Sequence, residues 1–271
     1  MSQEPIGVLR SRWDRVGEMT IHSRVSTCPT VPGAPVIVLV HGLVISSLYM
    51  VPTAVRLAPF FPVFAPDLPG FGRSSKPETV LRIPELADAL AAWIETLGLR
   101  QVVLVGNSLG CQVIADFATR HLHYIRAAVL AGPTMDCNAR TAPRQIGRWL
   151  RDWTRERPSL AAAHAKDYYE AGLSRAWETF QFALQDRMEE KLSALRVPTL
   201  VVRGAHDAIV PQGWAEEVTR RLPQGRLAVI PGGPHVVNYT TPIEFTRIVR
   251  GFVHEVLDES GSREDAAPSG A

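Results

Sequence analysis

Short, continuous apolar runs recur along the chain and alternate with segments whose apolar residues return every three or four positions. The runs are rich in Val, Ile and Leu, which is typical of strands buried on both faces of a parallel sheet. They predict strands at residues 36–40, 62–65, 101–105, 127–131, 199–202 and 226–230, with a further candidate at 19–25.

Helices are predicted between these strands. In residues 84–97 the apolar side chains share one helical face, and Gly98 is placed to end that helix. Comparable segments lie at 48–59 (starting near Pro52), 111–119, 214–222 and 243–257. This alternation predicts an α/β protein with a mostly parallel, doubly wound sheet. In such a sheet, functional groups gather at the carboxyl ends of the strands.

Strand-like runs disappear between residues 138 and 196, where amphipathic helices are predicted instead. The clearest has an apolar face and an arginine face on its opposite side. The apolar face is formed by Ile146, Trp149, Leu150 and Trp153, and the arginine face by Arg144, Arg148, Arg151 and Arg155. Two more helices are predicted at 159–171 and 174–188. We expect a helical cap and not a membrane-surface helix, because Asp152 and Glu156 interrupt the basic face, which we interpret as solvated.

These patterns divide the chain into four parts. We expect residues 1–137 and 197–257 to form two parts of one α/β core, and residues 138–196 to form a helical cap or lid. Residues 258–271 are polar and contain Gly, Pro and Ser, so we expect a disordered tail.

Composition narrows the class of protein but does not identify it. The 271 residues are 46% hydrophobic and 21% charged, as in ordinary globular proteins. A formal charge of +2 gives no reason to expect nucleic acid or stable membrane association. Three cysteines without a CxxC pair predict neither disulfides nor a metal site. We expect a cytoplasmic location, because neither a signal-peptide core nor a membrane-length apolar run is present; the oligomeric state stays open.

The most informative motif is Gly106-Asn107-Ser108-Leu109-Gly110, between a predicted strand and a predicted helix. A serine on so sharp a turn is strained, and the chain passes close to itself on both sides. Glycines at 106 and 110 remove the Cβ atoms that would collide. The serine hydroxyl is then exposed above the sheet, and the helix N-terminus behind it favours a developing negative charge.

Other polar residues also directly follow predicted strands. They are His41-Gly42, Asp207 and His235, and we expect them to meet Ser108 at one edge of the sheet. Serine is a weak nucleophile without a base, and histidine can both accept and return a proton near neutral pH. Of the eight histidines, five follow no predicted core strand and are expected at the surface or in packing: His22, His121, His123, His164 and His254.

Five segments occur in the order found in enzymes of the α/β-hydrolase fold: VLVHG (38–42), DLPGFGRS (67–74), GNSLG (106–110), RGAHDAIVP (203–211) and PGGPH (231–235). On these motifs the chain resembles the α/β-hydrolase superfamily over roughly residues 18–257. The resemblance implies a capped α/β-hydrolase fold and a serine nucleophile. It does not specify the substrate.

The resemblance also implies roles for individual residues. Ser108 would be the nucleophile, His235 the base, and Asp207 the acid that orients the imidazole. Asp136 follows the preceding strand, where some members of the fold carry this acid, but the turn before Asp207 fits the usual pattern better. The backbone N–H groups of Leu43 and Leu109 would form the oxyanion hole.

The same comparison suggests which residues surround the substrate. We expect His41, Gly42, Asn107 and Val236 to line its pocket, with His41 itself structural. Leu43, Leu109 and the cap tryptophans suggest that the pocket is apolar. Asp67 lies in a loop that is structural in this superfamily, so we do not expect it to be catalytic.

The implied reaction is a two-step acyl transfer that needs no metal or organic cofactor. A serine at the elbow argues against haloalkane dehalogenases and epoxide hydrolases, which carry aspartate there. We expect a small-to-medium carboxylic ester as the substrate. A thioesterase remains an alternative, as does a C–C bond hydrolase of ring-cleavage products.

The sequence around the elbow bears on the last of these. Asn107 resembles the elbow of the C–C hydrolases, but HGLVISS (41–47) lacks their glycine-rich loop, and Val236 stands where they usually carry tryptophan. A non-catalytic small-ligand receptor on the same fold is a further alternative.

Overall fold

The computed structural model describes residues 7–28 and 33–265. Within them, eight strands form one sheet in the order β1-β2-β4-β3-β5-β6-β7-β8. Strands β1 and β2 form an antiparallel hairpin, β2 is antiparallel to β4, and the other neighbours are parallel. The strands are β1 (Leu9–Val16), β2 (Met19–Ser26), β3 (Ile37–Val40), β4 (Val63–Pro66), β5 (Val102–Asn107), β6 (Ile125–Ala131), β7 (Thr199–Gly204) and β8 (Gly225–Ile230).

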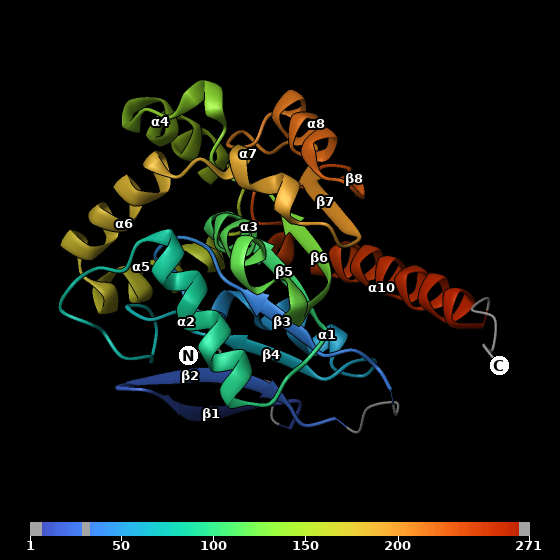
Figure 1. Ribbon diagram of the computed structural model, residues 1–271. Helices are drawn as coiled ribbons and strands as arrows, with labels where there is room; N and C mark the ends of the chain where they lie inside the picture. The colour runs from blue at the N-terminus through green and yellow to red at the C-terminus, as the bar shows by residue number, and fades with distance from the viewer. Residues whose placement is uncertain (1–6, 29–32, 266–271) are drawn as a thin grey trace.

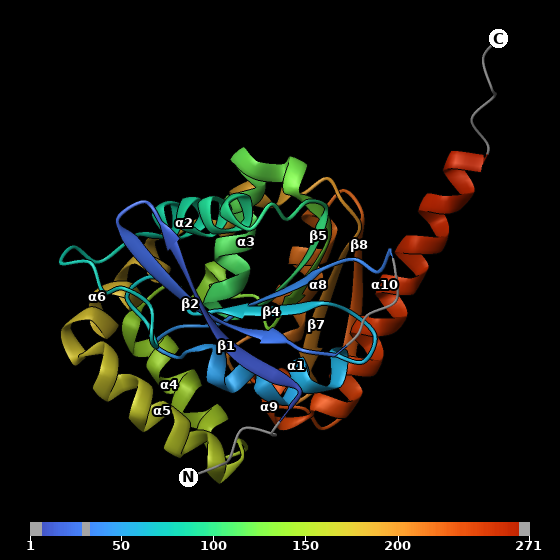
Figure 2. The same cartoon turned by 90° about the horizontal axis from the view of Figure 1, so that it is seen from below.

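Helices cover both faces of this sheet (Figures 1 and 2). One face packs against α2 (Ile83–Thr96), α3 (Leu109–His121), α7 (Met188–Lys191) and α8 (Gln212–Arg221). The other packs against α1 (Val51–Leu57), α9 (Val237–Thr240) and α10 (Pro242–Asp265). The doubly wound α/β fold predicted from the sequence is therefore confirmed.

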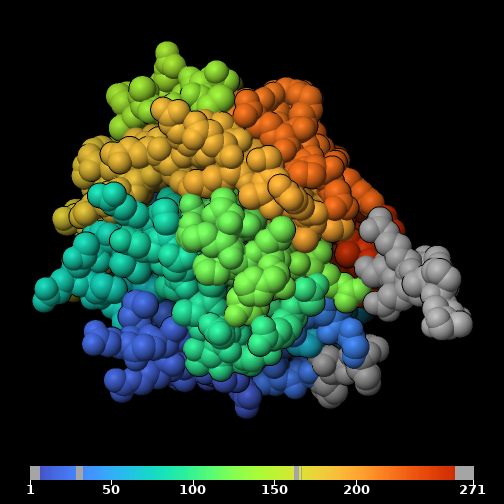
Figure 3. Space-filling model, viewed as in Figure 1, coloured from blue at the N-terminus to red at the C-terminus, as the bar shows by residue number. Residues whose placement is uncertain are grey.

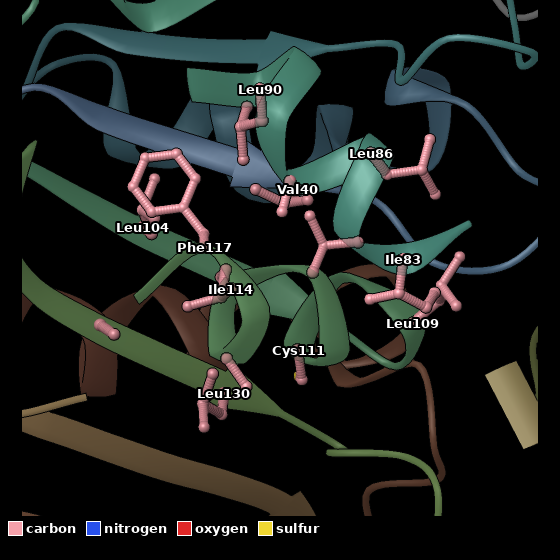
Figure 4. Close-up of a cluster of buried hydrophobic side chains, with 14 of the residues drawn as sticks. Val40, Ile83, Leu86, Leu90, Leu104, Leu109, Cys111, Ile114, Phe117 and Leu130 are labelled. Carbon is pink, nitrogen blue, oxygen red and sulfur yellow. The ribbon is translucent and has the colours of Figure 1, made fainter. Parts of the chain in front are cut away.

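The central strands are apolar on both sides because both sides are covered. Successive side chains of a strand point to opposite faces, so Val38 and Leu104 pack toward α2 and α3, whereas Leu39 and Val103 pack toward α1 and α10. Figure 4 shows the first of these cores, where Phe117 and Ile114 of α3 meet the side chains of the sheet. The continuous apolar runs in the sequence follow from this burial on both faces.

Besides α7, the region predicted as the cap contains three longer helices: α4 (Ala142–Trp153), α5 (Pro158–Ala171) and α6 (Leu173–Gln185). We call these the cap helices. They lie together at one end of the sheet (Figures 1 and 2), and in the space-filling view α4 and α6 continue into the surface formed by α7 and α8 (Figure 3). Throughout the described ranges, no helix has the length and apolar character needed to cross a bilayer.

Two parts of the structure differ from the sequence prediction. Strand β1 was not predicted, because an edge strand with charged, partly exposed side chains has no apolar period to detect. The prediction of a disordered tail from Asp258 is wrong for residues 258–265, which continue α10. The rest of that predicted tail, residues 266–271, lies outside the described residues.

The core around α3 predicts a large stability effect at one position. Phe117 is fully buried, so Phe117→Ala should lower the free energy of unfolding by about 3–5 kcal/mol through lost burial and a residual cavity. Ile243→Ala is the control, because this α10 side chain is 72% exposed and its loss should change stability by less than about 0.5 kcal/mol. Urea unfolding measures both, and equal midpoint shifts would contradict this placement of the core.

Candidate active site

The turn between β5 and α3 holds Ser108 in a strained conformation. Its φ is 55° and its ψ is −118°, a backbone region that residues other than glycine rarely adopt. A Cβ at Gly106 would lie 2.7 Å from the carbonyl carbon of Gly110, and one at Gly110 would lie 2.4 Å from the oxygen of Val40. Both glycines of the motif are therefore required by close backbone contacts, as the sequence predicts.

Two loops at the same edge of the sheet bring together an acid and a base. Asp207 follows β7 and His235 follows β8, and the imidazole Nδ1 lies 2.9 Å from Asp207 Oδ2. The other carboxylate oxygen of Asp207 accepts hydrogen bonds from the N–H groups of Ile209 and Val210, each at 2.8 Å. These bonds fix the carboxylate, and the carboxylate in turn fixes the imidazole with Nδ1 as the donor.

The second ring nitrogen of His235 is the one available for chemistry. Nε2 is buried and has no hydrogen-bond partner within the described part of the chain. His235 and Ser108 line the same cavity. Gly132 allows the ring to pack there, because a Cβ at this position would lie 2.9 Å from both Cε1 and Nδ1 of the imidazole.

The rival acid, Asp136, is engaged elsewhere. One of its carboxylate oxygens pairs with Arg148 at 2.7 Å, and the other accepts a hydrogen bond from the N–H of Asn138 at 2.9 Å. The carboxylate that contacts the His235 ring is that of Asp207. Geometry thus favours Asp207, as the turn pattern in the sequence does.

The loop after β3 presents its backbone to the same cavity. Leu43 lines the cavity together with Leu109, the first residue of α3. Neither backbone N–H donates a hydrogen bond to an acceptor in the described ranges. Val44 has a φ of 53°, which is unusual for a β-branched residue and marks a sharp turn next to Leu43. Two unpaired N–H groups beside a serine are what an oxyanion hole requires.

A buried hydrogen-bond network joins this loop to the elbow. The hydroxyl of Tyr49 accepts from the N–H of Gly42 at 2.8 Å and donates to Asn107 Oδ1 at 2.9 Å. The amide nitrogen of Asn107 donates to the carbonyl oxygen of Ala131 at 3.1 Å. Asn107 borders the cavity, but its polar atoms are used to fix the positions of the loops.

His41 and Gly42 do not line the cavity, contrary to the sequence prediction. The His41 ring is fully buried; its Nδ1 lies 2.8 Å from the carbonyl oxygen of Gly42, and its Nε2 accepts from the N–H of Leu68 at 2.9 Å. Burial lowers the pKa of His41, against a smaller opposing effect of Asp67. A neutral ring with Nδ1 protonated satisfies both bonds, so His41 holds two loops together.

A second serine also lies beside a histidine–carboxylate pair. His22 is buried between Asp67 Oδ2, at 2.7 Å from its Nδ1, and Ser11 Oγ, at 3.1 Å from its Nε2. Hydrogen bonds hold the pKa of Asp67 at about 2 although burial opposes this. None of the three residues lines the Ser108 cavity, and Ser11 lies on the edge strand β1 with an ordinary extended backbone. Ser11 therefore provides a natural comparison for Ser108.

The cavity has a volume of about 340 Å³, near the lower end of the range of small-molecule sites. Leu43, Leu109 and Val236 line it, as predicted from the sequence. Most of the remaining wall comes from large apolar side chains of the cap helices: Ile146, Trp149, Trp153, Leu160, Trp177 and Phe180. Trp149 and Trp177 are 37% and 49% exposed, so part of this apolar wall also faces solvent.

The charges around the cavity are acidic. Asp152 and Glu156 belong to its wall, and among the described lining residues there is no Lys or Arg. Burial raises the pKa of Asp152 and raises that of Glu156 to about 7. These two carboxylates were not predicted as site residues, because the sequence shows them only as interruptions of an arginine face.

The electrostatic environment favours the protonated form of His235. Burial opposes the charged ring, but the carboxylates of Asp207, Asp152 and Glu156 outweigh it and raise the pKa of His235 to about 9. Because of this raised pKa, the neutral form of the ring binds a proton tightly and is therefore a strong base. Across the described ranges, no group of three or more His, Cys, Asp or Glu side chains is placed to hold a metal ion.

Comparison with known proteins identifies a family. Residues 37–248 match the model of a family described as the alpha/beta hydrolase family. The matched range extends from β3 into α10 and includes Ser108, Asp207 and His235.

Two curated relatives align with much of the chain. A 2-(acetamidomethylene)succinate hydrolase from Mesorhizobium japonicum is 26% identical over 90% of this chain and 95% of that protein. A pimeloyl-[acyl-carrier protein] methyl ester esterase from Neisseria meningitidis is 28% identical over 77% of this chain and 73% of that protein.

Among solved structures, a bacterial membrane phospholipase A described as a virulence factor superposes with a TM-score of 0.79, at 21% identity, over 93% of this chain and 88% of its own. At such identity the likeness concerns the fold.

The assignment of the acid can be tested without any substrate. Replacing Asp207 with Asn removes the carboxylate that contacts the imidazolium, so the pKa of His235 should fall by about 1–3 units. Asp136→Asn is the matched control and should leave this pKa near 9. Histidine NMR titration measures both, with the His235 signal assigned by its loss in His235→Gln; a larger shift in Asp136→Asn would identify Asp136 as the acid.

Proposed function

The chain belongs to the alpha/beta hydrolase family, and from this premise we propose that it hydrolyses small-to-medium carboxylic esters with Ser108, His235 and Asp207. Its relatives are hydrolases, and it is an enzyme of that class. One observation carries the proposal: a strained serine and a histidine that is held by an aspartate face the same cavity, beside two unpaired backbone N–H groups.

In the first half of the proposed reaction, Ser108 Oγ attacks the ester carbonyl carbon while Nε2 of His235 takes the hydroxyl proton. Asp207 holds the imidazole through Nδ1 and stabilises the imidazolium that forms. The N–H groups of Leu43 and Leu109 donate to the oxyanion, an interaction worth about 10²–10³ in rate for each donor. The imidazolium then protonates the departing alcohol, and the acyl group stays on Ser108.

The second half releases the acid. Neutral His235 removes a proton from water, and the hydroxide oxygen attacks the acyl carbon in the same oxyanion site. The tetrahedral intermediate expels Ser108 Oγ, which receives its proton from Nε2. Each half returns the histidine to its starting state, so the chain's own residues complete the cycle.

The shape and charge of the cavity favour a neutral, apolar acyl group. The tryptophans of the cap helices supply apolar contact area, and the described wall offers no Lys or Arg to pair with a substrate carboxylate. Asp152 and Glu156 would repel such a carboxylate directly. An unpaired charge in a buried site costs several kcal/mol, which disfavours a dicarboxylate such as the one named for the Mesorhizobium relative. The methyl ester named for the Neisseria relative supports ester chemistry.

Hydrolysis of p-nitrophenyl esters from acetate to dodecanoate tests the nucleophile. Wild type should turn over the shorter members, and Ser108→Ala should lower kcat on the order of 10⁶-fold, to background. Ser11→Ala is the matched control, since Ser11 also lies beside a histidine–carboxylate pair, and it should keep wild-type kcat. Full activity in Ser108→Ala, or loss of activity in Ser11→Ala, would refute the assignment.

A wild-type enzyme that leaves every ester intact would refute the ester proposal itself. Thioesters and ring-cleavage products would then be tested for turnover. Saturable binding of a small ligand without turnover would identify a receptor on this fold instead.

Charge selectivity is tested with two esters of equal acyl length. The value of kcat/KM for p-nitrophenyl butyrate should exceed that for mono-p-nitrophenyl succinate by about 100-fold or more, because the second substrate buries an unpaired carboxylate. Ile146→Arg places a cation in the cavity wall and should narrow the difference, whereas Ile146→Met should not. Equal rates for the two esters in wild type would show that the acidic wall does not select the substrate.

A further inference from the structure

Asp152 joins the cap to both catalytic loops. It lies in the last turn of α4 and is buried. Its Oδ2 accepts a hydrogen bond from the backbone N–H of His235 at 3.2 Å, and its Oδ1 accepts from the N–H of Ala208 at 3.1 Å. One carboxylate thus bridges the residue proposed as the base and the residue that follows the proposed acid.

Glu156 makes a parallel contact from the turn that follows α4. Its Oε1 accepts from the backbone N–H of Val236 at 2.8 Å, and its Oε2 accepts from the hydroxyl of Thr240. Consecutive N–H groups at His235 and Val236 therefore each have a cap carboxylate as acceptor.

Arginines of the same segment complete the attachment. Arg148 donates to the carbonyl oxygen of Ile209 at 3.1 Å, and Arg155 donates to that of His206 at 2.8 Å. The face predicted from the sequence as solvated is in part a contact surface against the loop of Asp207. Along the Asp207 loop, the cap donates to His206, accepts from Ala208 and donates to Ile209. These bonds fix the Asp207 loop relative to the loop of His235.

We propose that Asp152 and Glu156 are positioning residues, which hold the main chain at His235 against the loop of Asp207 and stabilise the protonated imidazole during acyl transfer. The proposal rests on the function proposed above for His235. Neither carboxylate takes part in bond making, because all four oxygens are occupied by N–H or O–H donors of the protein. Their effect reaches the substrate through the base.

The charges around the imidazole support this role. Burial opposes a charged ring, and Asp207, Asp152 and Glu156 together raise the pKa of His235 to about 9. On the other side, Arg203 donates to the backbone oxygens of Asp207 and Val210. The guanidinium groups of Arg148 and Arg155 contact backbone oxygens of the same loop. The negative charges closest to the ring therefore come from two elements, the loop after β7 and the cap.

The sign of the pH effect follows from these charges. Burial raises the pKa of Glu156 to about 7, so this carboxylate gains its charge as the pH rises through neutrality. Below that pH it carries a proton and attracts the imidazolium less. Removal of either cap carboxylate should lower the pKa of His235, and should move the acid limb of kcat/KM to lower pH.

Asp152→Asn and Glu156→Gln test the proposal with two readouts. Asp152→Asn leaves a backbone N–H opposite an NH₂ group, so we expect kcat on a p-nitrophenyl ester to fall about 10–100-fold through displacement of the base. Glu156→Gln can keep the bond from the Val236 N–H and donate to the Thr240 hydroxyl, so it removes the charge and should lower kcat less. The pKa of His235, measured by NMR, should fall by about one unit in each variant. Asp152→Glu keeps the charge and should keep the pKa near 9.

Two control variants separate this effect from a general disturbance. Asp167→Asn removes another buried carboxylate of the cap helices, which accepts from the N–H of Ser46 at 2.9 Å and not from the His235 loop. It should leave the pKa of His235 unchanged. Glu244→Gln, at an exposed ion pair on α10, should leave both kcat and the pKa unchanged.

The possible outcomes are distinguishable. An unchanged His235 pKa in both Asp152→Asn and Glu156→Gln overturns the proposal, even if kcat or the melting temperature falls, because only folding would then depend on these contacts. A shift of equal size in Asp167→Asn also overturns it. The NMR readout needs no substrate, so it tests the carboxylates even if wild type hydrolyses no ester. Should Asp152→Asn fail to fold, the less buried Glu156→Gln decides.

Discussion

The close approach of three backbone segments at Ser108 is the constraint on which the rest of the site depends. Strand β3, the end of β5 and the first turn of α3 come so near one another that a Cβ at Gly110 would lie 2.4 Å from the oxygen of Val40. Such an approach persists only where the surroundings determine it fully. Parallel pairing of β5 with β3 and β6, and the buried face of α3, supply that support.

The sequence predicts the residues of this site that are placed by local patterns, and misses those placed by contacts between distant parts of the chain. Ser108 and Asp207 follow buried strands, and His235 follows the edge strand β8. Parallel strands bring their carboxyl ends together, so local patterns suffice. The contacts of Asp152 and Glu156 depend on the docking of α4, which no local pattern records. The same limit explains His41, whose position after a strand suggests the cavity although two backbone contacts bury it elsewhere.

The two serine–histidine–aspartate arrangements show why side-chain identity alone does not define a site. Both ring nitrogens of His22 are within hydrogen-bond distance of a partner, Asp67 or Ser11, whereas Nε2 of His235 has no partner in the described chain. Catalysis by such a group requires space for the acyl carbon and donors for the oxyanion. A cavity and two N–H donors that are free in the described ranges are found around Ser108. The unpaired Nε2 of His235 is therefore better evidence for a catalytic role than the Nε2 of His22, which is bonded to Ser11 at the sheet edge.

On the proposed function, the cap helices link substrate selection to the chemistry. Trp149 and Trp153 form part of the apolar wall, and Asp152 lies between them in sequence and contacts the His235 backbone. A shift of α4 that admits a larger acyl group would therefore also move Asp152, the carboxylate that accepts a hydrogen bond from the His235 backbone. Since the charge of that acceptor acts on the imidazole, changes of α4 that alter acyl selectivity should alter the basicity of His235 as well. On the proposed mechanism, the pocket and the base are coupled through α4.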